Sequence, residues 1–128
     1  MGNIDGDGCV KITYANNKVE MQCTSMKDAT RLFGGDRNLA ISLLARINAL
    51  ESADVIRDII IMPTFHFHNL HGKWEGFFAI DVKTRKDKWR IILQPLDEDE
   101  RPFVSCHIDV IAASVKIIEI REVSAHYE

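Results

Sequence analysis

Residues 65–93 read FHFHNLHGKWEGFFAIDVKTRKDKWRIIL, and this stretch decides the fold. Residues 76–82 and 88–93 are rich in β-branched and aromatic side chains, which suit the half-buried surface of a sheet. The polar residues 83–87 between them suit a hairpin turn. We therefore predict two strands joined by a short loop, and this loop is also where basic residues gather.

The N-terminal residues predict an opening β-hairpin. Apolar and polar side chains alternate over residues 10–14 and again over residues 19–23, as they do in half-buried strands. Asn16 and Asn17 lie between the two runs, and asparagine tolerates the left-handed backbone of tight hairpin turns.

Residues 25–60 carry the signals of three helices. Ser25 is a predicted N-cap for the first, and the glycines at 34 and 35 are its predicted stop. Asp36 is placed to cap a second helix, and Asp54 a short third one. The second helix would present one apolar face, made of Leu39, Leu43, Leu44, Ile47 and Leu50.

The C-terminal third adds a strand over residues 115–123, whereas residues 103–108 fit either a strand or an irregular segment. The order of a hairpin, then helices, then strands is typical of the α+β class. We predict a helical hairpin packed on one face of a twisted, mainly antiparallel β-sheet, with the N-terminal β-hairpin as an addition to it.

Length and composition favour a soluble protein of ordinary size. The 128 residues predict one domain over residues 1–128, with residues 1–9 as a flexible end. No apolar run reaches the roughly 18 residues of a membrane span, and no signal peptide is recognisable. Cys9, Cys23 and Cys106 are odd in number and widely spaced, which favours reduced thiols in a cytoplasmic protein.

Charge is distributed unevenly along the chain. The formal net charge is -3, which argues against a nucleic-acid-binding surface over the whole molecule. Residues 64–94, however, hold six basic and three acidic residues, whereas residues 95–128 hold three basic and eight acidic ones. A basic segment is thus embedded in an acidic protein, either as a binding surface or as the solvated flank of an exposed hairpin.

Three histidines, His66, His68 and His71, precede the first of the two strands. If the backbone is extended, His66 and His68 point to the same face, and with His71 they could hold a divalent metal ion. No fitting carboxylate or thiolate lies near them in sequence. We therefore predict no metal site, with packed or exposed histidines as the simpler interpretation.

Arg90 lies between Trp89 and Ile91 in a predicted strand, so its side chain should point away from the face that both neighbours share. An arginine placed there is costly unless it lines a cleft or is paired. The sequence leaves two interpretations, a functional cleft or a structural ion pair with Asp81 or Glu119.

Residues 68–76 resemble the His-Pro-Leu-Lys-Gly-x-x-x-Gly signature of the RelE/HigB-like toxins of bacterial type II toxin–antitoxin systems. Residues 77–82 resemble the next strand of that family, and residues 89–93 resemble its Trp-Arg-Ile strand. Residues 122–127 resemble its closing strand and the tail that bears Tyr and His. The order and spacing of these pieces, more than any single one, carry the resemblance.

The resemblance implies a ribosome-dependent endoribonuclease that cleaves mRNA in the A site without a metal or cofactor and is silenced by a cognate antitoxin. Such an enzyme must position the RNA 2′-hydroxyl, move two protons and stabilise charge on the phosphate. The catalytic residues that the resemblance implies are Arg90, His71, His126 and Tyr127. The RNA-binding residues that it implies are Lys73, Lys83, Arg85 and Lys86.

Some features favour an alternative in which the protein acts only by binding an antitoxin or another protein. His71 stands where many relatives have lysine, and a neutral imidazole is a weak phosphate clamp. The acidic balance is unusual for a ribosome-directed toxin, because RNA binding is largely electrostatic. The N-terminal hairpin and residues 101–113 exceed the minimal family unit, and they could brace the sheet or form a homodimer or partner surface.

Overall fold

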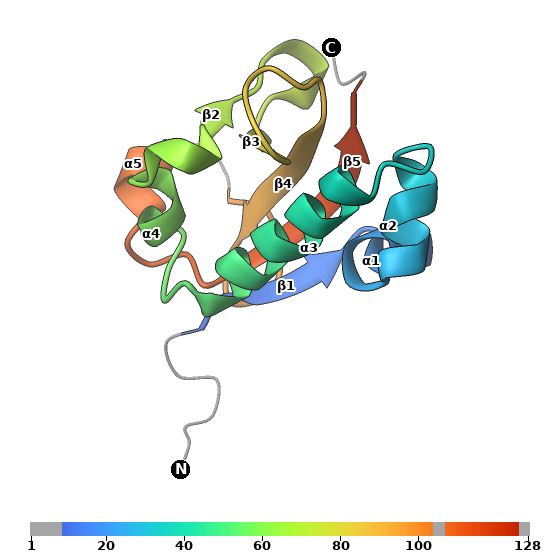
Figure 1. Cartoon of the computed structure of the whole chain (residues 1–128). Helices are drawn as coiled ribbons and strands as arrows, with labels where there is room; N and C mark the ends of the chain where they lie inside the picture. The colour runs from blue at the N-terminus through green and yellow to red at the C-terminus, as the bar shows by residue number, and fades with distance from the viewer. Residues whose placement is uncertain (1–8, 104–106, 126–128) are drawn as a thin grey trace.

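The computed structural model describes residues 9–103 and 107–125, and within them five strands form one sheet in the order β1-β5-β4-β3-β2 (Figure 1). β1 pairs with β5 in parallel, and every other pair is antiparallel. The strands are β1 (Lys11–Tyr14), β2 (His68–Asn69), β3 (Phe78–Asp81), β4 (Arg90–Leu96) and β5 (Ile117–Ser124). The predicted α+β class and mainly antiparallel sheet are confirmed.

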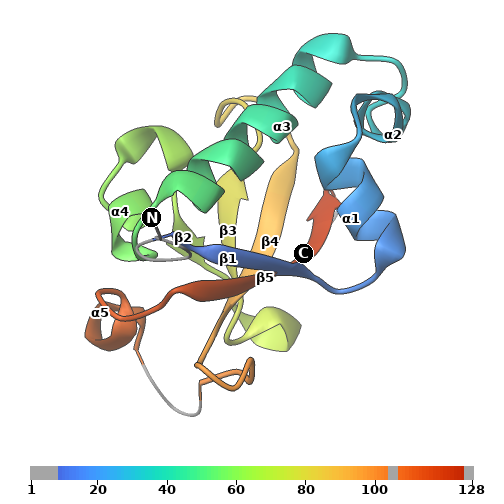
Figure 2. The ribbon, with the colours of Figure 1, turned by 90° about the horizontal axis from the view of Figure 1, so that it is seen from below.

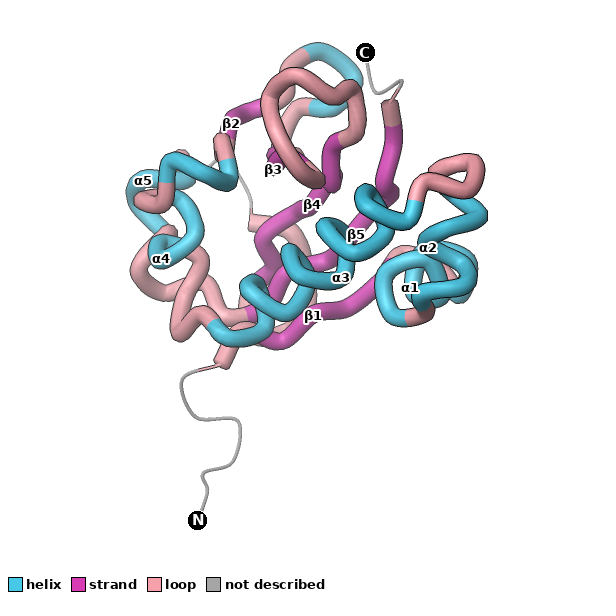
Figure 3. The backbone as a smooth tube through the Cα atoms, in the orientation of Figure 1, coloured by secondary structure: helices cyan, strands magenta, loops and turns pink. Residues whose placement is uncertain are grey.

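Helices cover one face of this sheet. Figure 2 shows α3 lying along that face with α1 and α2 beside it, whereas α4 and α5 lie together at one end of the sheet in Figure 1. Two short turns of 3-10 helix, η1 and η2, precede and follow the short strand β2, and Figure 3 draws them in cyan with the other helices. The helices are α1 (Asn17–Thr24), α2 (Met26–Leu32), α3 (Arg37–Ser52), α4 (Arg57–Ile60) and α5 (Ile108–Ile111), and the turns are η1 (Pro63–Phe65) and η2 (Gly72–Trp74).

The predicted N-terminal β-hairpin is wrong, because its second half is the helix α1. The Asn16 side chain accepts a hydrogen bond from the Val19 amide at 3.0 Å, so Asn16 is an N-cap and not a turn residue. Val19 and Cys23, the two buried residues of α1, are four residues apart and lie on one helix face. Over five residues this spacing satisfies a helix as well as a strand, and β1 pairs with β5 instead.

The two main helix signals are confirmed. Ser25 Oγ accepts from the Asp28 amide at 3.3 Å, and Asp36 Oδ1 accepts from the Leu39 amide at 3.1 Å. Gly34 has a φ of 66°, the left-handed conformation expected at the end of α2. Of the predicted apolar face of α3, Leu43, Ile47 and Leu50 are buried, and Leu39 and Leu44 are half-buried.

The start of α4 and the segment after β4 also bear on the sequence-based predictions. Asp54 does not cap α4, because Asp58 Oδ2 instead accepts from the amides of Asp54 and Val55, at 3.0 and 3.3 Å. The carboxylate therefore sits inside the short helix and reaches back over its start. In the described part of residues 101–108, Pro102 forms an isolated bridge with Leu96, and a helix, α5, begins at Ile108.

The two faces of the sheet bury different clusters. Ile80 and Ile91, partners across β3 and β4, belong to the main core with the buried residues of α3. Ala79 and Ile92 are the next partners along the same strands and point to the opposite face, where they pack with Leu70. Asp81 and Arg90 follow the alternation of Ala79 and Ile92, so this pair lies on the face away from α3.

Cys9 and Cys23 are free thiols, and Cys106 lies outside the described residues. Cys23 is 1% exposed, and burial raises the pKa of its thiol to about 12. Within residues 9–103 and 107–125, no helix has both the length and the apolar character that crossing a membrane requires.

The buried thiol gives stability a pH dependence on the alkaline side. In the unfolded chain the Cys23 thiol ionises near its ordinary pKa, whereas the folded protein keeps it protonated up to about 12. Its contribution is therefore complete below the ordinary pKa and is lost as the pH rises. Between pH 8 and pH 10, the free energy of unfolding should fall by about 1 kcal/mol more in the wild type than in Cys23→Ala.

Urea unfolding at the two pH values measures this difference. The matched control is Cys9→Ala, because Cys9 is exposed and its removal should leave the wild-type pH dependence in place. The same loss of stability in Cys23→Ala as in the wild type would contradict the role of the buried thiol.

Candidate functional site

Residues 82–89, which we call the basic loop, connect β3 to β4. The loop is flanked by Asp81 and Arg90, which are partners in the sheet. The Asp87 carboxylate fixes the loop backbone from within. It accepts hydrogen bonds from the amides of Thr84 at 2.8 Å and Trp89 at 2.9 Å. The loop is therefore held in one conformation by its own hydrogen bonds.

Arg90 fills the inside of the basic loop with its guanidinium group. It donates to the carbonyl oxygens of Arg85 at 3.1 Å, Asp87 at 2.8 Å and Trp89 at 2.8 Å. Its Nε lies 3.2 Å from Asp81 Oδ1, an ion-pair contact whose geometry is not that of a hydrogen bond. The side chain is only 11% exposed, so these internal contacts use nearly all of it.

A second arginine, Arg46 of α3, holds the start of the basic loop. It donates to the carbonyl oxygens of Val82 at 3.2 Å and Lys83 at 3.0 Å. It also donates to the Thr64 carbonyl at 3.1 Å and stacks on the Phe65 ring, with 4.7 Å from the guanidinium carbon to the ring centroid. Arg46 thus ties the loop to the segment that enters β2.

The side chains of Lys83, Arg85 and Lys86 are exposed on the basic loop. The backbone carbonyls of Lys83 and Arg85 accept hydrogen bonds from Arg46 and Arg90, respectively. Because the backbone is fixed and the three cationic groups stay in solvent, the loop offers a preorganised positive surface. Such a surface suits the phosphates of a nucleic acid.

His66 contacts Asp81, the residue directly before the basic loop; we call this position the base of the loop. Its Nδ1 lies 3.1 Å from Asp81 Oδ1, the oxygen that also faces Arg90. His66 has a φ of 51°, a left-handed conformation that costs a residue with a side chain about 1–2 kcal/mol. The ring of His68 lies beside it, with 4.5 Å between the centroids, and His68 Nδ1 is 2.7 Å from the His66 carbonyl oxygen.

His71 and Lys73 lie elsewhere, at the turn η2. His71 is the exposed residue before this turn, and Lys73 is exposed within it. β2 and β3 are antiparallel, so His71 lies beyond the Phe78 end of β3, whereas Asp81 and Arg90 mark the other end. The strand rise separates the two ends by about 10 Å, so the structure does not gather His71 and Arg90 in one cluster.

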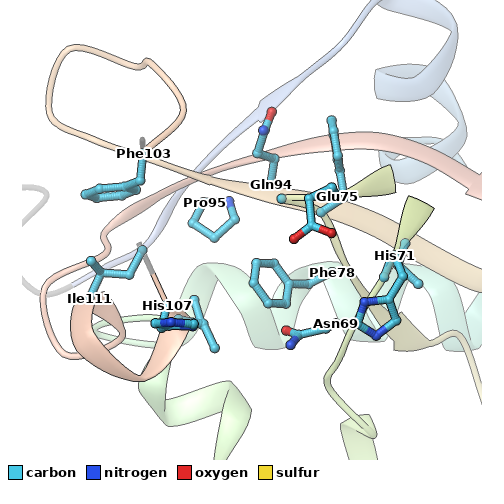
Figure 4. Close-up of a pocket in the computed structure, with 13 residues that line it drawn as sticks. Asn69, His71, Glu75, Phe78, Gln94, Pro95, Phe103, His107 and Ile111 are labelled. Carbon is cyan, nitrogen blue, oxygen red and sulfur yellow. The ribbon is translucent and has the colours of Figure 1, made fainter. Parts of the chain in front are cut away.

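His71 instead lines a cavity of about 110 Å³ between the sheet, η2 and α5 (Figure 4). In Figure 4, Phe103, His107 and Ile111 lie on one side of Phe78, and His71 and Glu75 lie on the other. The polar residues of its lining are Asn69, His71, Glu75, Gln94 and His107.

The remaining predicted site residues can be placed as follows. His126 and Tyr127 lie outside the described residues. Arg90 forms the ion pair with Asp81 that the sequence offered as one of two interpretations, and its action on a phosphate stays a prediction. Across residues 9–103 and 107–125, no three His, Cys, Asp or Glu side chains are arranged to hold a metal ion, so the three-histidine alternative finds no such arrangement there.

Comparison with known proteins adds the following. No family model matches the chain, and no curated protein matches its sequence. Among solved structures, the chain is similar to YafQ from E. coli strain BL21(DE3), with 13% identity and a TM-score of 0.47 over 91% of this chain and 93% of that one. It is also similar to a YafQ mutant from E. coli, with 16% identity and a TM-score of 0.47 over the same shares. At these identities, function has to be inferred from the chain's own residues.

Sequence reasoning missed two members of the site, His66 as a partner of Asp81 and Arg46 as a brace of the loop. One signal for the first was present, because Asp81 ends an apolar strand and a buried carboxylate needs a partner. For Arg46 there was none, since its contacts are 18 to 37 residues away in sequence.

Proposed function

We propose that this protein is the toxin of a bacterial type II toxin–antitoxin system, and that it cleaves mRNA in the ribosomal A site. The observation that carries the proposal is the basic loop. It holds Lys83, Arg85 and Lys86 in solvent on a braced backbone, and it directly follows Asp81, a buried carboxylate that contacts His66. The motif resemblance of residues 68–76 and 89–93 to RelE/HigB-like toxins supports the same function.

RNA cleavage fits the side chains that are present. The RNA brings its own nucleophile, the 2′-hydroxyl, so the protein needs cations for the phosphates and groups that exchange protons. Lys83, Arg85 and Lys86 supply the cations. Lys73 at η2 is a further candidate to contact a phosphate elsewhere on the RNA. A cytoplasmic location and a cognate antitoxin follow from the same proposal, and His71, His126 and Tyr127 stay candidates for catalysis.

The test compares a variant that removes three positive charges from the basic loop with one that removes three from another surface. Replacing Lys83, Arg85 and Lys86 together with glutamine should weaken binding to single-stranded RNA about 100-fold at 0.1 M salt and reduce the salt slope by about 2. Fluorescence anisotropy at several salt concentrations measures both. The fold should be kept, because the backbone carbonyls and not these side chains make the internal contacts.

Induced expression in a bacterium then tests the activity. The wild type should arrest growth and produce new mRNA ends within A-site codons, and the loop variant should do neither. Lys18→Gln, Lys27→Gln and Arg31→Gln together form the control, because these exposed residues of α1 and α2 give the same charge change away from the loop. Soluble wild-type protein that causes no arrest and no new ends would contradict the proposed enzyme.

A specific observation supports the non-enzymatic alternative. Ile61 is 64% exposed and Met62 46% exposed after α4, and Val110 of α5 is 74% exposed. α4 adjoins the end of α5, since the Arg57 amide donates to the Ala112 carbonyl at 3.1 Å. Exposed apolar side chains at this end of the molecule suit a protein partner. Tight antitoxin binding without cleavage would favour this function.

A further inference from the structure

We propose that His66, oriented by Asp81, is the residue that takes the proton from the RNA 2′-hydroxyl. This inference rests on the proposed ribonuclease function and names a residue that the motif resemblance does not include. It follows from the contacts of the His66 ring, its position at the base of the basic loop and the partial exposure of its side chain.

The contacts of His66 fix which ring nitrogen carries a proton. Asp81 is 2% exposed at its side chain and pairs with Arg90, so its carboxylate is ionised and can only accept hydrogen bonds. His66 Nδ1, 3.1 Å away, is therefore the donor. In a neutral imidazole the other nitrogen, Nε2, then has a free lone pair. A carboxylate behind Nδ1 also stabilises the ring once Nε2 is protonated, which is the arrangement that a general base requires.

Solvent and substrate can reach this ring. The His66 side chain is 31% exposed, and in the described part of the chain Nε2 has no hydrogen-bond partner. β2 and β3 run antiparallel with His68 opposite Ala79, which places His66 beside Asp81 at the loop end of β3. An RNA phosphate held by the basic loop would therefore lie close to the exposed side of His66.

The left-handed backbone of His66 supports a functional role. Arg46 donates to the carbonyl of Thr64, two residues before His66, and His68 Nδ1 donates to the carbonyl of His66 itself. These contacts keep the residue in a conformation with a φ of 51°, and strained residues held this firmly cluster at active sites.

The charged and titratable groups around His66 come from four elements. They are Asp81 of β3, Arg90 of β4 through that carboxylate, His68 of β2 at 4.5 Å between ring centroids, and Arg46 of α3 behind the Thr64 carbonyl. A general base can take a proton only while its imidazole is neutral. The rate should therefore rise with pH as one imidazole loses its proton.

The step balances without a co-reactant. The 2′-O–H bond breaks and its proton passes to His66 Nε2, while the 2′-oxygen forms a bond to phosphorus. The bond from phosphorus to the 5′-oxygen breaks, and that oxygen takes a proton from a general acid or from water. The products are a 2′,3′-cyclic phosphate and a 5′-hydroxyl, and His66 then returns its proton to solvent.

The decisive variant is His66→Asn, because asparagine can keep the contact with Asp81 and the left-handed backbone of His66. Its amide nitrogen stands where Nδ1 stands and can donate to Asp81, and asparagine tolerates a left-handed backbone. It lacks the atom equivalent to Nε2 and the aromatic ring that lies beside His68. Single-turnover cleavage of mRNA on programmed ribosomes, from pH 6 to pH 8.5, should be at least about 100-fold slower in this variant at pH 7.5.

Further readouts separate this role from a structural one. Wild-type cleavage should rise with pH through one ionisation that His66→Asn lacks, while ribosome binding stays within about threefold of the wild type. Asn38→Ala, which removes an exposed polar side chain on the first turn of α3, should keep the wild-type rate and pH profile. Nitrogen NMR of the wild type should show His66 with its proton on Nδ1 at pH 8.5.

Each contrary outcome has a distinct meaning. A wild type that cleaves mRNA together with a His66→Asn that cleaves equally well overturns this assignment and leaves the ribonuclease function standing. A neutral His66 with its proton on Nε2 overturns it as well, whatever the cleavage assay gives. A wild type that cleaves no mRNA removes the function and this assignment together.

Discussion

Replacing Arg90 with alanine is expected to lower the free energy of unfolding by about 3–5 kcal/mol. The substitution removes three hydrogen bonds to loop carbonyls and leaves the Asp81 carboxylate, 2% exposed, without its cationic partner. A buried charge that loses its partner pays its desolvation cost in full, which is why one-sided truncation is so damaging. Urea unfolding of both proteins at pH 7 measures the difference.

A surface arginine provides the matched control. Arg121 is 49% exposed at its side chain and lies 3.6 Å from Glu119, so Arg121→Ala should cost less than about 1 kcal/mol. Asp81→Asn and the double variant complete a double-mutant cycle, in which the two losses should be clearly non-additive. An Arg90→Ala protein as stable as the wild type would contradict the internal role and would favour Arg90 as a phosphate ligand.

The contacts of Arg90 also decide how activity should be tested. Loss of toxicity in Arg90→Ala would follow equally from a lost phosphate contact and from a collapsed loop. Lys83, Arg85 and Lys86 avoid this ambiguity, because their exposed side chains can be changed without touching the hydrogen bonds inside the loop. The motif resemblance implied that Arg90 is catalytic, and its burial shows why the loop cations are the better choice for mutation.

The parts of the fold that were predictable are those with strong local signals. Ser25 and Asp36 accept the capping hydrogen bonds that their positions predicted, and the strands around residues 83–87 were recognisable from their composition. The N-terminal hairpin was wrong because residues 19–23 are too few to separate a period of 2 from one of 3.6. What decided that segment was Asn16, an equally good turn residue and N-cap.

The candidate site was less predictable than the fold, because its contacts join distant parts of the chain. Lys83, Arg85 and Lys86 could be found from local charge, since an exposed loop needs no tertiary partner to be basic. The His66–Asp81 contact could not, because it depends on the register of β2 against β3. His71 drew attention by its place in a motif, yet it lies at the other end of β3 from Arg90.

Replacing Arg46 with methionine is expected to slow mRNA cleavage by tenfold or more without removing any cation that faces solvent on the basic loop. Arg46 donates hydrogen bonds to the carbonyls of Val82 and Lys83 on the loop. It also donates to the carbonyl of Thr64, two residues before His66. Burial lowers the pKa of its guanidinium, and the nearby carboxylates of Asp81 and Asp87 oppose that shift. Methionine fills the space of the side-chain stem but donates no hydrogen bond, so the loop and the His66 segment lose their common anchor.

Three measurements distinguish this effect from a loss of RNA contacts. Hydrogen exchange of residues 82–89 should accelerate in Arg46→Met, whereas the salt slope of RNA binding should stay at the wild-type value because Lys83, Arg85 and Lys86 are still present. Cleavage should nevertheless fall, since small displacements of catalytic groups cost large factors in rate. Arg37→Met, on the exposed first turn of the same helix, should change none of the three. Unchanged exchange and unchanged cleavage in Arg46→Met would mean that the Asp87 hydrogen bonds and Arg90 suffice to hold the loop.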